Sequence, residues 1–117
     1  MQLESTELAQ AIVDIMDDRQ AADIVLLDIR PVSLISDYFV IATGETKRQL
    51  SALADTIRDT VRTTSGIKPL AVEGAADSGW IILDYSGVVA HLFGPEERDY
   101  YKLDQLWEEG TLIVRIK

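Results

Sequence analysis

The chain contains no cysteine, one histidine, three prolines and no long run of apolar residues. Without cysteine it can form no disulfide, thiolate metal site or cysteine nucleophile, which fits a reducing compartment. Its longest apolar runs, Ile24–Leu27 and Tyr38–Ala42, are far shorter than the roughly 18 to 20 residues of a membrane helix. We therefore expect a soluble protein that makes no contact with a membrane.

The N-terminal segment also lacks the features of a targeting signal. It carries acids at Glu4 and Glu7 and has no basic stretch ahead of an apolar one, unlike a secretory signal or an Arg-rich transit peptide. We expect a cytoplasmic protein. A chain of 117 residues has the length of one ordinary domain, so we assign residues 1–117 to a single domain.

Basic side chains are scarce as well. Eleven Lys and Arg stand against twenty Asp and Glu, which gives a formal charge of −9. Because binding to a phosphate backbone depends on basic side chains that release counterions, this composition argues against direct, sequence-specific contact with nucleic acid. A basic protein surface is the more natural partner. Acidity that serves solubility alone explains the charge equally well.

The spacing of apolar residues predicts two long amphipathic helices. The first covers residues 4–19. The second helix begins at Thr46, which together with Gln49 matches the S/T-x-x-E/Q pattern of a capping box. It ends at Gly66, a suitable C′ residue.

Five strands are predicted in addition to these helices. Unbroken runs of β-branched and aromatic residues mark the first two as central strands covered on both faces, and Pro69 argues for an edge position of the third. Ser86-Gly87 is typical of a tight hairpin turn between the last two. The strands are Ile24–Ile29, Tyr38–Ala42, Lys68–Glu73, Trp80–Tyr85 and Val88–Phe93.

A short helix over Asp99–Trp107 closes the predicted fold, with Tyr101 and Trp107 packing it onto the sheet. The order α-β-β-α-β-β-β-α indicates an α/β fold with a mixed five-stranded sheet. Residues 111–117 form a C-terminal tail to which the pattern assigns no role. If both long helices pack on one side, part of the other face stays open, and there we expect a partner.

The sequence shows no pattern typical of an active site. Asp28, Asp37 and Asp84 lie at strand ends, but none belongs to a D-x-D pair. His91 is the single histidine, so it cannot make a multi-histidine metal site, and no serine lies in the strained elbow of a catalytic triad. We predict that the protein is not an enzyme and holds neither a metal nor a cofactor.

The best candidate site is one of partner binding. Strand alternation sends Trp80, Ile82 and Asp84 to the same face of the sheet, and two large apolar side chains followed by an acid suit a basic partner. We add His91 as a hydrogen-bond donor on that exposed face. The alternatives are that Trp80 belongs to the core and that His91 is a structural residue of its strand.

Six segments, taken in order, resemble the Iojap family, the ribosomal silencing factors. Each segment alone is weak, but the ordered set from about Leu8 to Trp107 is specific. The segments are Asp23–Asp28, Asp37–Gly44, Glu73–Gly74, Gly79–Tyr85, Val88–Phe93 and Tyr101–Trp107.

The resemblance implies a nucleotidyltransferase-like fold without its catalytic residues. It implies binding to the large ribosomal subunit through large-subunit protein fourteen, a basic protein on the face that meets the small subunit. A factor bound there blocks subunit joining and represses translation when nutrients are short, and the family also appears in large-subunit biogenesis. Members are often dimers when free, so we expect a homodimer. Trp80 and Asp84, with His91 beside them, would lie on or near the partner-binding face.

One departure from the family pattern affects the expected binding. The family usually has an acidic residue where this chain has Gly87, in the turn before the last predicted strand. If that acid contacts the ribosome, binding by this chain is weaker or differently arranged. Two other functions stay open: a nucleotidyltransferase-like enzyme, and a dimeric interaction module with a non-ribosomal client.

Overall fold

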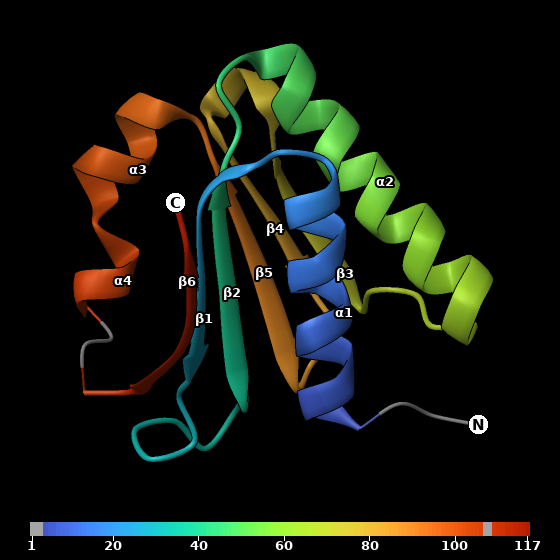
Figure 1. Ribbon diagram of the computed structural model, residues 1–117, viewed down its shortest axis with the longest axis vertical. Coiled ribbons are helices and arrows are strands. Elements are labelled where there is room, and N and C mark those ends of the chain that lie inside the picture. The colour runs from blue at the N-terminus through green and yellow to red at the C-terminus, as the bar shows by residue number, and fades with distance from the viewer. Residues whose placement is uncertain (1–3, 107–108) are drawn as a thin grey trace.

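A six-stranded mixed sheet forms the centre of the structure, with helices on both of its faces (Figure 1). The computed structural model describes residues 4–106 and 109–117. In chain order the elements are α1 (Ser5–Asp18), β1 (Ala22–Asp28), β2 (Tyr38–Thr43), α2 (Lys47–Ser65), β3 (Ala71–Ala75), the 3-10 helix η1 (Ala76–Ser78), β4 (Trp80–Asp84), β5 (Val88–Phe93), α3 (Pro95–Tyr101), α4 (Leu103–Leu106) and β6 (Thr111–Ile116).

The strands lie in the order β3-β4-β5-β2-β1-β6. The pair β2–β5 is parallel, and the other neighbouring pairs are antiparallel. The first two predicted strands are confirmed as interior strands, and β3 is an edge strand as Pro69 indicated. It starts only at Ala71, because Pro69 lacks the N–H that a strand ladder requires.

Both long helices pack on the same face of the sheet, which we call the first face. Figure 1 shows α1 and α2 on one side of the strands and α3 and α4 on the other. The ends of α2 are those predicted: Thr46 Oγ1 accepts a hydrogen bond from the Gln49 N–H at 3.0 Å, and Gly66 takes a φ of 70°. The condition under which we expected an open area on the other face is therefore met.

One hydrophobic cluster lies on each face of the sheet. The large cluster joins α1 and α2 to the strand residues that point toward them, among them Leu26, Val40 and Leu83. The small cluster lies on the opposite, second face, and Leu103 of α4 packs into it beside Phe93. Helices thus cover the first face except along the exposed edge strand β3, and they cover only part of the second face.

The predicted five-stranded sheet is wrong by one strand, because residues 111–116 of the assumed tail form β6. This strand pairs antiparallel with β1, with Ile116 opposite Ile24 and Val114 opposite Leu26. Val114 and Ile116 pack against the large cluster. Apolar residues at positions 114 and 116 with Arg115 between them fit a strand, but the segment is too short for this pattern alone to distinguish a strand from an irregular tail.

The closing segment also differs from its prediction. It begins four residues earlier and is divided into α3 and α4 at Lys102, which takes a left-handed φ of 49°. Pro95 opens α3, at a position where its missing N–H costs nothing. Tyr101 packs on the sheet as expected, whereas Trp107 lies outside the described residues.

The assignment of β6 leads to a stability prediction. Val114→Ser removes a side chain packed against the large cluster, so we expect a loss of about 1 kcal/mol in the free energy of unfolding. Ile113→Ser is the matched control, because Ile113 is 48% exposed and should cost little. Urea unfolding of both variants measures the difference. Equal, small losses would show that the segment does not pack as a strand.

Candidate functional site

The uncovered part of the second face lies over β4 and its neighbours. The side chains of Trp80, Ile82 and Asp84 point to this face and are all half-buried. Glu73 on the edge strand is exposed and lies opposite Ile82, and the half-buried Phe39 of β2 borders the same area. We call these five residues the candidate patch.

Trp80 has both a structural and a surface role. Its ring centroid lies 4.6 Å from that of Tyr101 and 4.9 Å from that of Phe93. Its Nε1–H donates a hydrogen bond to Nδ1 of His91 at 3.2 Å. The indole therefore packs against the small cluster, and only its exposed part is available to a partner.

His91 does not lie on an exposed face, which corrects our expectation. The side chain is 6% exposed, beneath Trp80 and edge-on to Phe39 at 4.6 Å between centroids. It faces the same side as predicted, but larger neighbours on adjacent strands cover it. Because Nδ1 accepts the hydrogen bond from Trp80, Nε2 carries the proton of the neutral ring. That Nε2 has no acceptor among the described residues.

The acids of the candidate patch give it a negative charge. Asp84 lies opposite Ala71, one step along the sheet from the Glu73–Ile82 pair. One oxygen of Asp84 accepts the Ser86 N–H at 2.8 Å and so shapes the β4–β5 turn, which leaves its other oxygen outside that bond. The apolar side chain of Ile82 thus has two carboxylate neighbours on the same face, Glu73 on β3 and Asp84 on β4.

The other strand-end aspartates do not gather with Asp84 into one site. Asp28 is bound by Arg30 instead, with Nη2 2.6 Å from Oδ2, and these hydrogen bonds lower the pKa of Asp28. Within residues 4–106 and 109–117, no three His, Cys, Asp or Glu side chains lie close enough together to hold a metal ion. No helix within those ranges is long and apolar enough to cross a membrane.

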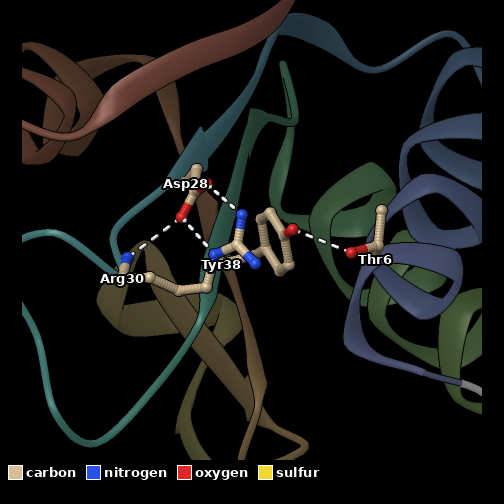
Figure 2. A network of polar contacts seen from close by, with 4 residues as sticks. All are labelled: Thr6, Asp28, Arg30 and Tyr38. Atoms are coloured by element: carbon tan, nitrogen blue, oxygen red, sulfur yellow. Dashed lines mark hydrogen bonds and ion pairs between the residues drawn. The ribbon is translucent and has the colours of Figure 1, made fainter.

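A polar network fixes the end of the sheet where β1 leads into β2 (Figure 2). The Arg30 guanidinium lies between the Asp28 carboxylate and the Tyr38 ring, 5.2 Å from the ring centroid. The Tyr38 hydroxyl shares a hydrogen bond of 2.8 Å with Thr6 of α1. The network joins the β1–β2 connection to the first turn of α1.

Gly87 has a structural explanation in this chain. A Cβ placed there would collide with the Ser5 hydroxyl and would lie 3.5 Å from Oδ2 of Asp37. An acidic side chain at this position would require the Ser5 hydroxyl to move and would add a second carboxylate next to Asp37. Gly87 and the first turn of α1 therefore fit each other.

Sequence reasoning found three of the five patch residues and missed Glu73 and Phe39. Glu73 was hidden because the predicted third strand was placed three residues too early, which obscured its pairing with Ile82. Phe39 was treated as core, although strand alternation places it on the second face with Ile41. Alternation within β2 could have revealed Phe39, whereas Glu73 required the register of β3 against β4.

Comparison with known proteins now identifies the family. A family model described as "Ribosomal silencing factor during starvation" matches residues 2–117. The chain belongs to this family, which includes Iojap. The protein named Ribosomal silencing factor RsfS of Bacillus subtilis is 38% identical over 96 residues, which cover 82% of this chain and 80% of that protein.

Other relatives agree with this assignment. Protein Iojap, chloroplastic, of Arabidopsis thaliana is 30% identical over 94% of this chain, which spans 45% of that protein. The mouse protein named Mitochondrial assembly of ribosomal large subunit protein 1 is 30% identical over 82% of this chain, which spans 43% of that protein. The family thus extends from bacteria to organelle proteins with additional segments.

Solved structures of similar proteins share the fold. A crystal structure of a Chromobacterium violaceum protein superposes with a TM-score of 0.85 at 27% identity and covers 98% of this chain and 94% of its own. A Bacillus halodurans structure gives 0.80 at 32% identity, with coverage of 93% and 98%. The six-stranded architecture is therefore not peculiar to this sequence.

The buried histidine leads to a prediction on pH. Burial lowers the pKa of His91 to about 4, and the nearby Asp84 carboxylate only partly opposes the shift. Between pH 6.5 and 4 the unfolded chain takes up a proton that the folded chain does not, so stability falls as the pH falls, by up to about 3 kcal/mol. His91→Gln should lack this component.

The measurement is chemical denaturation of both proteins across this pH range. The difference between wild type and His91→Gln cancels the titration of the carboxylates that both proteins share. Parallel stability curves would contradict the buried, neutral state of His91.

Proposed function

We propose that this protein is a ribosomal silencing factor that binds the large ribosomal subunit through large-subunit protein fourteen. The candidate patch is the surface that docks. The bound protein stands where the small subunit would join, prevents joining by its bulk and so represses translation. It acts in the cytoplasm, without catalysis and without a cofactor.

Membership in the silencing-factor family is the observation that carries this proposal. The patch supports it through its chemistry. Glu73 and Asp84 flank Ile82, and the half-buried Trp80 adds an aromatic side chain of the type that dominates interface energies. Acids around an apolar centre complement a basic protein, and the net charge of −9 favours the approach of such a partner.

A role in large-subunit biogenesis belongs to the same proposal. It is supported by the mouse relative, whose name refers to the assembly of the mitochondrial large subunit. A factor that holds the joining face of the large subunit would also keep unfinished subunits from entering translation. We further propose that the free protein is a homodimer.

The first test is sedimentation with separated ribosomal subunits. We expect the protein to comigrate with large subunits and not with small ones, and to reduce the formation of joined ribosomes. Because acids make much of the contact, raising the salt concentration should weaken binding. Failure to comigrate at both low and moderate salt would overturn the proposal. Metal-dependent nucleotide binding in calorimetry would favour a nucleotidyltransferase-like enzyme instead.

A charge substitution tests the docking surface. Ile82→Arg places a cation between Glu73 and Asp84 and against a basic partner, so we expect binding to large subunits to weaken by tenfold or more. Val72→Arg is the matched control, because it changes the net charge equally from a half-exposed position on the first face of the neighbouring strand. Equal affinities of the two variants, measured by the same sedimentation, would exclude the candidate patch as the binding surface.

A further inference from the structure

The loop between β1 and β2, residues 29–37, has an apolar tip that the fold does not use. Leu34 is fully exposed and Ile35 is 88% exposed, with Val32 beside them at 38%. Isolated apolar residues on a surface are ordinary, but three exposed ones within four positions of one loop are not. Neither hydrophobic cluster of the protein includes any of the three.

This tip stands on a rigid base. The N–H groups of Val32 and Ser33 both donate to the Ile29 carbonyl, at 3.0 and 2.8 Å. Ser33 Oγ accepts from the N–H groups of Ile35 and Ser36, at 3.2 and 3.3 Å. Below these turns the Asp28–Arg30–Tyr38 network holds the beginning of the loop (Figure 2). These bonds restrict the backbone of the loop before any partner binds, which lowers the entropy lost on binding.

Two hydrogen bonds connect Asp84 of the candidate patch, through Ser86, to Ser36 of the loop. Asp84 of the patch accepts the Ser86 N–H at 2.8 Å, and the Ser86 carbonyl accepts from Ser36 Oγ at 2.9 Å. Ser36 is the residue next to Ile35. The loop therefore lies at the same end of the sheet as Asp84.

The size of the tip indicates what occupies it. Each partner in a stable protein interface buries about 800 Å². Three aliphatic side chains present far less, so the tip alone cannot hold a second copy of this chain. As an extension of the patch it needs to contribute only one apolar contact.

We propose that Leu34 and Ile35 insert into an apolar recess of the same basic large-subunit protein that the candidate patch contacts. This inference rests on the proposed function and adds to it a second contact of different physical character. The acids of the patch supply salt-sensitive attraction. The tip supplies an apolar contact that salt does not screen.

The test is the double variant Leu34→Ser/Ile35→Ser, which removes the apolar surface without adding charge. We expect its binding to large subunits to weaken by tenfold or more at every salt concentration, with an unchanged melting temperature because both residues are exposed. The control is Leu70→Ser/Val72→Ser, which removes two exposed aliphatic side chains near β3, where Val72 faces the first face.

The outcomes separate the two proposals. If the wild type does not bind large subunits, the proposed function fails. If the wild type binds and the loop variant binds equally well, only the role of the tip is overturned. A control pair that weakens binding as much as the loop pair would also overturn it. So would a loop variant that loses self-association in ultracentrifugation but keeps its affinity for subunits, because a second copy would then be the occupant.

Discussion

The parallel pairing of β2 with β5 is the constraint on which the rest of the structure depends. The strands β3, β4 and β5 form an antiparallel unit, so β3 also runs parallel to β2. The chain must therefore return along the sheet between β2 and β3, and α2 provides this return. With α1 beside it, the first face is covered over the strands inside β3. What remains of the chain, two short helices, can cover only part of the second face.

The partial cover explains the mixed character of the candidate patch. Tyr101 and Leu103 contact the small cluster at one end of the second face. Beyond them no helix shields the strand side chains from solvent, so these side chains must cover one another. They do so with large aromatic rings over His91, at the cost of a buried Nε2 without an acceptor among the described residues. Trp80 thus supports the fold with one part of its surface and is open to solvent with another. A substitution of Trp80 would confuse loss of binding with loss of stability.

The sequence was sufficient for the elements whose signals are local. The capping box at Thr46, the glycine at position 66 and the apolar runs of β1 and β2 each encode their structure within a few residues. Strand alternation also placed Trp80, Ile82 and Asp84 on one face, whereas the side on which the two long helices pack was left open.

Features that depend on distant partners were not predictable in this way. Strand β6 forms because Val114 and Ile116 find the large cluster, a contact with residues nearly ninety positions away that no local pattern reveals. The burial of His91 depends on the rings of Phe39 and Trp80, which lie on two other strands. Register between neighbours, rather than alternation within one strand, determined these outcomes.

The contacts of the first turn of α1 have a mechanical consequence. Ser5 fills the space above Gly87, and Thr6 holds the hydroxyl of Tyr38. One helical turn thus contacts both the β4–β5 hairpin and the strand that follows the β1–β2 connection. Fraying of that turn would remove both contacts together, so the start of α1 and this end of the sheet are mechanically coupled.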